Sequence, residues 1–199
     1  MRFDLQVIAS WIEPEMSVLD LGCGRGDLLA YLKRSRQIQG TGIECSEVKV
    51  ARCIERGLTV LQGDFREEVT DYPPARFDVV ILSQTLQQIR DPKELLEDLL
   101  RIGKRVIVSF PNFAHWATRF KLLFSGTAPV TRQLPYEWYN TPNIRVISVK
   151  DFKRFLQMMG VRIVQEVAIN TYHREYKGNT VRYFKNLRAT YGIMMLEQM

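Results

Sequence analysis

The stretch that decides the fold is Val18-Leu19-Asp20-Leu21-Gly22-Cys23-Gly24-Arg25-Gly26-Asp27-Leu28-Leu29. A mostly apolar run reaches an acid, and three glycines then separate it from a stretch with a helical pattern. This order is typical of a buried parallel strand that leads through a tight turn into a helix N-terminus. Gly22 and Gly24 can adopt backbone angles that other residues avoid, and they leave their N–H groups exposed. The sequence therefore predicts a loop that cradles a nucleotide, with a plain turn between strand and helix as the alternative.

The spacing of the glycines limits the choice of nucleotide. Dinucleotide-binding loops have the pattern G-x-G-x-x-G or G-x-G-x-x-A. Here the third glycine, Gly26, comes one residue early, and Asp27 stands where that pattern has a small residue. A carboxylate there would repel a pyrophosphate at the helix N-terminus. The loop therefore favours a cofactor without phosphates, and Asp20 beside it can hold a cationic amino group.

The pattern Asp-x-Gly-x-Gly-x-Gly from Asp20 to Gly26 resembles the S-adenosylmethionine loop of Rossmann-like, class I methyltransferases. The resemblance implies that the loop binds S-adenosylmethionine or its demethylated product, S-adenosylhomocysteine. Glu44 ends a predicted strand 22 residues after Gly22, the place of an acid that accepts hydrogen bonds from ribose hydroxyls. Asp64 follows a third strand and resembles the residue that methyltransferases set near the adenine edge, with Phe65 against the ring.

The predicted cofactor site combines the glycine loop with residues at the ends of later strands. Its members are Asp20, Gly22, Cys23, Gly24, Gly26, Glu44, Cys45, Asp64, Phe65, Ser83 and Gln84. A lone carboxylate at a strand end is usually a solvated turn or a helix cap, but two of them in the expected places favour binding. The three cysteines lack C-x-x-C spacing, so we expect neither a metal site nor a disulfide framework.

Catalysis is less clearly encoded than binding. In many small-molecule methyltransferases the end of the fourth strand borders the methyl group, and related chains often carry paired histidines where this one has Gln87 and Gln88. Glutamines can orient a substrate by hydrogen bonds, but they cannot act as a general base. They are equally consistent with exposed residues at the start of an amphipathic helix. No catalytic residue is assigned.

The rest of the chain alternates between strand and helix patterns. Five apolar strand patterns fall at residues 18–21, 39–44, 59–62, 77–82 and 105–110, and two further strands fall at 161–167 and 191–196. Alternation with helices requires a parallel, doubly wound sheet, whereas the last two strands predict an antiparallel hairpin. We therefore expect an α/β, Rossmann-like class I methyltransferase fold in one domain, residues 1–199, with a seven-stranded, mostly parallel sheet and a reversed last strand. A first helix is predicted with Asp4 as its N-cap.

Residues 111–147 interrupt this rhythm. They begin with an aromatic and basic helical pattern and continue as a proline-containing loop. Long irregular segments in compact domains are usually lids or binding loops, and this one follows the carboxyl end of a strand, where ligands bind in open α/β sheets. Because only a short helix precedes the glycine loop, we predict that 111–147 covers the cofactor. His115 is either a structural histidine or a substrate ligand or base.

The excess positive charge lies in the second half of the chain. The net charge is +6; residues 1–111 hold 15 basic and 17 acidic side chains, whereas residues 112–199 hold 13 basic and 5 acidic ones. No recognised nucleic-acid-binding motif accompanies this charge, so we interpret it as a solvated face or a partner surface. The stretch 170–188, which includes His173, is basic and aromatic. The sequence shows no signal peptide and no membrane span, which predicts a cytoplasmic protein.

Beyond the glycine loop, the segment Trp138-Tyr139-Asn140-Thr141-Pro142-Asn143-Ile144 and the opening of the chain resemble the bacterial family of the methionine biosynthesis protein MetW. This resemblance implies a methyltransferase fold and a role beside a homoserine O-acyltransferase of the MetX type. Two hypotheses follow from it. Either the chain binds S-adenosylmethionine and acts as a partner of the acyltransferase, or it transfers a methyl group to an unidentified small molecule.

Overall fold

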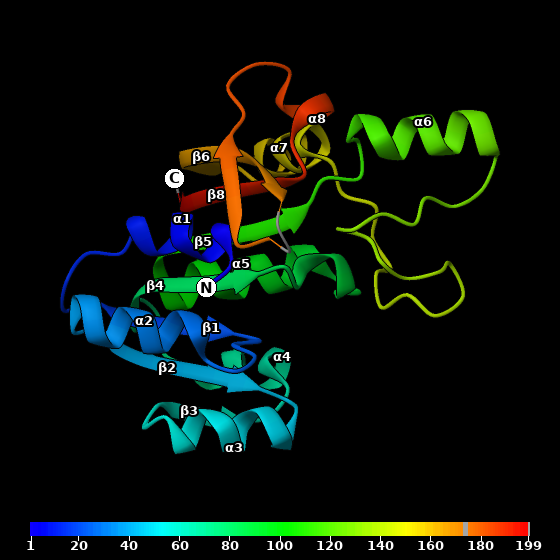
Figure 1. Ribbon diagram of the computed structural model, residues 1–199. Helices are drawn as coiled ribbons and strands as arrows, with labels where there is room; N and C mark the ends of the chain where they lie inside the picture. Colours follow the sequence, from blue (N-terminus) through cyan, green and yellow to red (C-terminus); the bar gives the residue numbers. More distant parts are fainter. Residues whose placement is uncertain (173–174, 199) are drawn as a thin grey trace.

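The computed structural model describes residues 1–172 and 175–198, and it contains one eight-stranded sheet (Figure 1). The strand order is β3-β2-β1-β4-β5-β8-β6-β7. The strands are β1 Ser17–Leu21, β2 Gln39–Glu44, β3 Thr59–Gln62, β4 Phe77–Ser83, β5 Gly103–Pro111, β6 Val161–Tyr172, β7 Lys177–Thr180 and β8 Tyr191–Gln198. His173, named above in the basic stretch, lies outside the described residues.

The sheet is parallel from β3 to β5 and then changes direction. Strand β1 pairs in parallel with both β2 and β4, and β8 pairs antiparallel with both β5 and β6. The predicted fold class and the reversed last strand are therefore confirmed. The expected number of seven strands was wrong, because the short edge strand β7 pairs antiparallel with the end of β6.

The helices cover both faces of the sheet. They are α1 Phe3–Ser10, α2 Asp27–Arg36, α3 Glu47–Glu55, α4 Phe65–Glu68, α5 Pro92–Ile102, α6 Trp116–Ser125, α7 Val149–Met158 and α8 Lys185–Arg188, with single 3-10 turns η1 Val69–Asp71 and η2 Leu86–Gln88. One core lies between the sheet and α1, α2 and α3, and the other lies under α5 and α7. This arrangement leaves the carboxyl ends of the parallel strands open at one edge.

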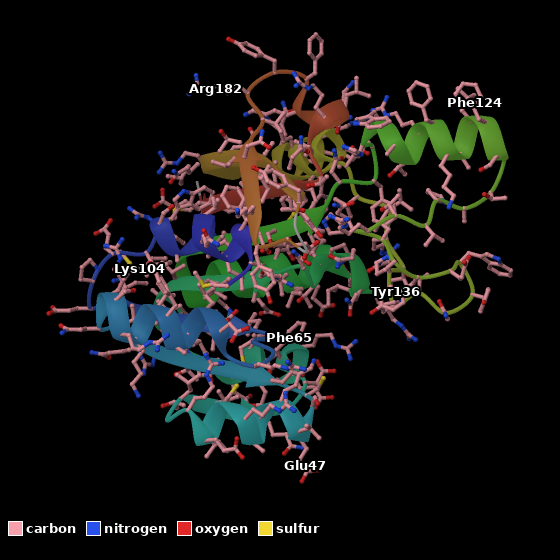
Figure 2. The ribbon with its side chains drawn as sticks, in the orientation of Figure 1. Glu47, Phe65, Lys104, Phe124, Tyr136 and Arg182 are labelled. Carbon is pink, nitrogen blue, oxygen red and sulfur yellow. The ribbon has the colours of Figure 1, made fainter. Side chains whose placement is uncertain are left out.

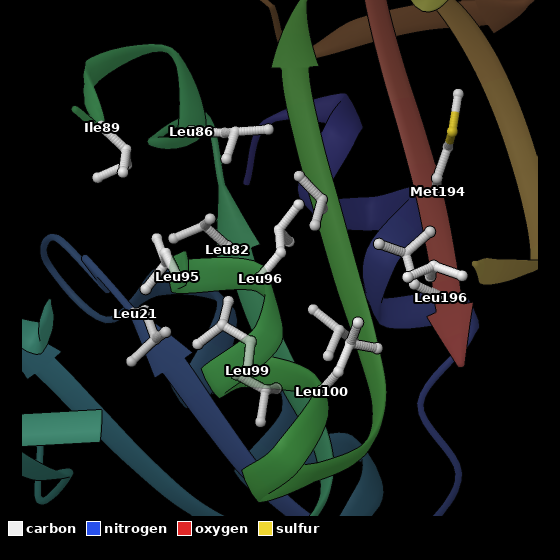
Figure 3. Close-up of a cluster of buried hydrophobic side chains, with 14 of the residues drawn as sticks. Leu21, Leu82, Leu86, Ile89, Leu95, Leu96, Leu99, Leu100, Met194 and Leu196 are labelled. Carbon is white, nitrogen blue, oxygen red and sulfur yellow. The ribbon is translucent and has the colours of Figure 1, made fainter. Parts of the chain in front are cut away.

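Helix α5 shows how strongly local sequence determines this architecture. Asp91 caps its N-terminus by accepting a hydrogen bond from the Glu94 amide, and Pro92 occupies the first turn, as the sequence predicts. Four leucines then point into the core beside β4 and β5 (Figure 3). Burial of each such side chain contributes about 1.5–3 kcal/mol, so this helix is fixed by both its cap and its buried face.

Helix α1 begins earlier than the sequence predicts. Its N-cap is Arg2, and Asp4 lies inside the first turn, almost fully buried. The Asp4 carboxylate accepts hydrogen bonds from the Arg2 guanidinium at 3.1 Å and from the Gln84 side-chain amide at 2.8 Å. The predicted N-cap role of Asp4 was therefore wrong, because its oxygens accept hydrogen bonds from Arg2 and from Gln84, the residue that follows β4.

The chain leaves the sheet between β5 and α7. Only α6 is regular in this excursion, which we define as residues 112–147. The Phe113 amide donates to the Ile147 carbonyl at 3.0 Å, so the two ends of the excursion meet. Figure 1 shows α6 and the following loop on the side to which the arrow of β5 points. The excursion thus starts at the edge where the strands end, and its function as a lid stays a prediction.

Candidate functional site

The glycine loop and the end of β2 are joined by backbone hydrogen bonds. The register of β1 and β2 sets Leu21 opposite Ile43, so the residues that follow both strands reach the same edge. The Gly22 amide donates to the Ile43 carbonyl at 2.8 Å, and the Gly24 amide donates to Glu44 Oε2 at 3.0 Å. The glycine loop and Glu44, both predicted site residues, are therefore in direct contact.

The glycines of the loop differ in why a side chain would be unfavourable at each position. Gly22, Gly24 and Gly26 all have positive φ, a conformation that costs other residues about 1–2 kcal/mol. A Cβ on Gly26 would lie 2.4 Å from Leu58 Cδ1 and 3.0 Å from Cys53 Sγ, whereas a Cβ on Gly24 would meet no atom within 4 Å. Gly26 thus serves packing, and the bare backbone of Gly24 faces open space that a ligand can fill.

A cavity of about 320 Å³ opens beside this loop. Seven of the predicted site residues line it, namely Asp20, Gly22, Cys23, Gly24, Glu44, Ser83 and Gln84. They come from β1, the loop, β2 and the end of β4, so the parallel strands deliver them to one place. Its lining includes no residue of the excursion.

Four predicted site residues are absent from this lining: Gly26, Cys45, Asp64 and Phe65. The Asp64 carboxylate caps α4 through the Arg66 amide at 3.0 Å and forms an ion pair with the Arg66 guanidinium. The Arg66 hydrogen bonds lower the Asp64 pKa more than its partial burial raises it. Phe65 packs at the edge of the core under α5. Asp64 and Phe65 as neighbours of adenine stay predictions.

Asp20 is the most unusual charge in the cavity. Its side chain is only 3% exposed, and none of the described residues donates a hydrogen bond to its carboxylate. Burial raises the pKa of Asp20 to about 7, against the opposing charge of Arg2 and with a further rise from Glu44. A buried carboxylate without donors is costly. A cationic group that enters the cavity would relieve this cost.

Glu44 is ionised by its surroundings despite its burial. Burial alone would raise its pKa, but hydrogen bonds from the Ser46 and Gly24 amides, together with the charge of Lys49, lower it below the ordinary value. The Lys49 ammonium lies 3.4 Å from Oε1. Because each carboxylate oxygen can accept about two hydrogen bonds and Oε2 receives only that of Gly24 among the described donors, Glu44 retains capacity for a ligand hydroxyl.

Sequence reasoning missed the wall that α1 supplies. Arg2 and Leu5 line the cavity, although we assigned its cover entirely to the excursion. The Arg2 guanidinium is held by Asp4 at 3.1 Å, and Asp4 in turn fixes the side chain of Gln84, a non-glycine residue with φ of 53°. The only signal in the sequence was a basic residue directly before the first helix, which does not reveal where that helix packs.

The cysteines and the described acids form no metal site. Cys23, Cys45 and Cys53 are all free, and within the described residues no cluster of potential metal ligands is found. Burial raises the pKa of Cys23 well above its ordinary value. A Cβ on Gly42 would lie 2.6 Å from Cys23 Sγ, so the thiol packs on β2. Cys23 therefore contributes shape rather than reactivity.

Gln87 links the cavity edge to the excursion. Gln87 is buried, contrary to the alternative of exposed glutamines, whereas Gln88 is exposed as that alternative expects. The Gln87 side chain donates to the Gln84 carbonyl at 2.7 Å. Its own carbonyl accepts from the Ile144 amide at 2.9 Å and the Arg145 amide at 3.0 Å. The Gln87 side-chain oxygen is buried without a partner among the described residues.

His115 lies at the start of α6 and caps this helix, because its Nδ1 accepts a hydrogen bond from the Ala117 amide. Partial burial lowers the pKa of His115.

These residues fit S-adenosylmethionine or S-adenosylhomocysteine. Asp20 offers an unpartnered carboxylate to an ammonium group, and Glu44 offers a carboxylate to ribose hydroxyls. The guanidinium of Arg2 faces the same cavity and can receive a carboxylate. The open space above Gly24 lets a ligand approach the backbone. The site thus matches the charges of an amino-acid nucleoside, because its lining combines the acids Asp20, Asp27 and Glu44 with the cations Arg2, Arg25 and Lys49.

Comparison with known sequences gives a family match over nearly the whole chain. Residues 2–196 match the model of the family described as methionine biosynthesis protein MetW. A bifunctional methionine biosynthesis protein MetXA/MetW from Rhodopirellula baltica is 33% identical over 176 residues, which cover 84% of this chain and 28% of the relative. A ubiquinone biosynthesis O-methyltransferase from Idiomarina loihiensis is 38% identical over 103 residues, which cover 48% of this chain and 42% of the relative. The chain spans less than half the length of these curated relatives.

Comparison with solved structures confirms the fold. A methyltransferase from Thermotoga maritima, described as a possible histamine N-methyltransferase, aligns with a TM-score of 0.70 at 19% identity over 98% of this chain and 87% of its own. The magnesium protoporphyrin IX methyltransferase of Synechocystis, solved with S-adenosylhomocysteine, gives 0.66 at 17% identity over 98% and 82%. Within residues 1–172 and 175–198, no helix has the length and apolarity of a membrane span.

Proposed function

This chain belongs to the family of the methionine biosynthesis protein MetW, and from that premise we propose that it binds S-adenosylmethionine or S-adenosylhomocysteine and supports a MetX-type homoserine O-acyltransferase as its partner. One observation carries the proposal. The cavity has charged groups suited to the cofactor, whereas the end of β4 contributes only the neutral side chains of Ser83, Gln84 and Thr85. The site is therefore better equipped to bind the cofactor than to accept a proton from a substrate.

In this proposal, each charged residue of the cavity binds a different group of the cofactor. Asp20 binds the ammonium group, Arg2 the carboxylate, and Glu44 the ribose hydroxyls. S-adenosylmethionine, when bound, supplies a methyl group on a positively charged sulfur. Asp4 acts through Arg2 and Gln84 and keeps both oriented toward the cavity. The helix α1 thereby becomes part of the binding site.

The acyltransferase is proposed as the partner because of the Rhodopirellula baltica relative. The name of this relative joins MetXA and MetW in one bifunctional protein, and this chain covers 28% of it. Fusion of two segments in one polypeptide raises their effective concentration, which benefits segments that act together. A separate chain of the MetW type would then bind the acyltransferase from solution.

Cofactor occupancy can regulate this partnership. Residues 83–85 line the cavity, and the nearby Gln87 carbonyl holds Ile144 and Arg145 at the end of the excursion. A ligand that prefers one arrangement of this segment shifts the equilibrium toward it, typically changing partner affinity by about 5–150-fold. Methionine synthesis would thereby respond to the supply of S-adenosylmethionine, which is made from methionine.

The test is the rate of acyl transfer to homoserine by the purified acyltransferase, measured with increasing amounts of this chain. We expect the rate to rise and to saturate as a complex forms. An unchanged rate at a molar excess of the chain, with and without S-adenosylhomocysteine, would contradict the proposal.

Methyl transfer to a small molecule is the second candidate. The buried, unpartnered side-chain oxygen of Gln87 favours it, because this oxygen could orient a substrate donor by hydrogen bonding. The same rate assay separates the two candidates. Stimulation by the chain with S-adenosylhomocysteine, which has no methyl group to give, supports the partner function, whereas methyl transfer predicts conversion of S-adenosylmethionine to S-adenosylhomocysteine during the assay.

A further inference from the structure

Helix α6 has no buried face. Of its ten residues only Thr118 is buried, although the helix contains two leucines, two phenylalanines and a tryptophan. Leu123 and Phe124 are each 75% exposed. Helices of this length are marginal in water, and in proteins their stability comes mainly from packing an apolar face. The apolar residues of α6 therefore have no explanation within this chain's own fold.

Three aromatic residues form a row along α6. Trp116, Phe120 and Phe124 follow one another at four-residue spacing, which sets them on one side of the helix. The ring centroids of Trp116 and Phe120 are 6.1 Å apart, and those of Phe120 and Phe124 are 5.4 Å apart. In Figure 2, Phe124 projects from α6 away from the loop that carries Tyr136. Such a row matches the anchors of a helix that enters an apolar groove.

The charges around this row have one sign. The excursion holds Arg119, Lys121, Arg132 and Arg145 against a single acid, Glu137. None of these four cations forms an ion pair with a carboxylate in the part of the chain that the structure describes. Arg119 and Lys121 instead donate to the carbonyls of Ala114 and Val130. On α6 itself, the aromatic row is thus flanked by Arg119 and Lys121, two cations that lack acidic partners among the described residues.

This charge distribution disfavours a second copy as the occupant. A symmetric dimer brings the same patch of both copies together, so the cations of one α6 would face those of the other. Like charges across an interface cost several kcal/mol, and complementary charges favour association. The surface that fits α6 is therefore an apolar groove with an acidic rim on a different protein.

We propose that the aromatic row of α6 is the surface by which this chain docks on the acyltransferase, in an apolar groove rimmed by acids. The inference rests on the proposed function, because that function supplies the partner. The row provides large, rigid anchors of the kind that dominate binding energy, and the flanking cations provide steering. Because the row lies outside the cofactor cavity, docking leaves the glycine loop accessible.

The experiment measures binding of the purified acyltransferase to the intact chain and to two variants, Phe120→Glu and Phe124→Glu. Each variant replaces an apolar anchor by a negative charge inside the apolar groove and beside its acidic rim, so we predict affinity weaker by about 30-fold or more. Ile54→Glu is the matched control, since Ile54 is 60% exposed on α3, away from the excursion, and it should bind as the parent does. Circular dichroism and cofactor titration check that each variant is folded.

The outcomes distinguish the two proposals. If the parent binds and the α6 variants bind equally well, the docking surface is overturned and the proposed function stands. If the parent does not bind the acyltransferase, the proposed function is contradicted, and the docking surface is overturned with it. If the parent alone dimerises and the α6 variants become monomeric without losing acyltransferase affinity, the row serves a second copy and the inference is wrong.

Discussion

The loop of residues 22–26 and helix α6 both follow a strand of the parallel sheet, yet their surroundings differ completely. Backbone hydrogen bonds tie the loop to Ile43 and Glu44, and packing against Leu58 fixes Gly26. Helix α6 buries one residue and exposes a row of aromatic rings. The residues of the loop are therefore explained by contacts within this chain and with a ligand. The exposed apolar residues of α6 have no such contacts, and they are explained by a partner protein.

Gly26→Ala should show the largest effect, because it attacks the packing of the loop. An alanine at positive φ costs about 1–2 kcal/mol, and the overlap of its Cβ with Leu58 and Cys53 adds about 1–3 kcal/mol. We expect the free energy of unfolding to fall by about 2–5 kcal/mol in a denaturant titration. Gly24→Ala is the control, because its Cβ meets open space. It should lower the free energy of unfolding only by the cost of positive φ, about 1–2 kcal/mol, and weaken cofactor binding. Equal stability losses would mean that the loop is not packed as described.

Asp20→Asn should have the next largest effect, this time on ligand affinity. The carboxylate that accepts the ammonium group is lost, so the binding free energy of S-adenosylmethionine should weaken by about 1–3 kcal/mol. Because burial raises the pKa of Asp20 to about 7, its ionised form destabilises the free protein at pH 8. The variant should therefore be more stable than the parent at pH 8 while it binds less well. Unchanged affinity would remove Asp20 from the site.

The pH dependence of binding should follow the same group. The ligand ammonium needs ionised Asp20, and with a pKa of about 7 this carboxylate becomes protonated as the pH falls from 7.5 to 5.5. Affinity should decrease toward low pH by up to about tenfold, or about 1.4 kcal/mol, per pH unit. Calorimetry at several pH values measures the slope. The slope should vanish in Asp20→Asn, and a parent whose affinity does not change with pH would contradict the assignment.

Phe124→Glu should have the smallest effect on the isolated chain. Because the side chain is 75% exposed, the free energy of unfolding should change by no more than about 0.5 kcal/mol, and affinity for S-adenosylmethionine should stay the same. Thermal unfolding and calorimetry check both. A large loss of stability would show that α6 packs on this chain's own body, which would remove the contrast between the two segments.

The parts of the fold that the sequence predicts best are those with strong local signals. Strands β2 and β3 begin and end at the predicted residues, and the cap and proline of α5 set its start. The edge strand β7, by contrast, reads Lys-Gly-Asn-Thr and carries no apolar alternation, so only its backbone pairing with β6 reveals it. Local patterns encode elements with a buried face, and they do not encode an edge that is held by backbone hydrogen bonds alone.

The site divides in the same way. Asp20 and Glu44 were predictable because parallel strands bring the residues at their carboxyl ends to a common edge. Arg2 was not, since its place depends on how α1 packs across the sheet, and Asp4 looked like a cap because the sequence does not show Gln84 beside it. The Asp64 carboxylate finds its partners locally, because it caps α4 and forms an ion pair with Arg66. A carboxylate at a strand end therefore predicts a position better than a role.

Calorimetric titration of the intact chain with S-adenosylmethionine, S-adenosylhomocysteine and NAD is the most direct test of the central claim, that this fold retains its cofactor site. We predict saturable binding of the first two at one site and none of NAD, with weaker binding of the first two in Asp20→Asn. If none of the three binds, the glycine loop is only a turn between strand and helix, and the function of the chain would reside on its basic, aromatic surface alone.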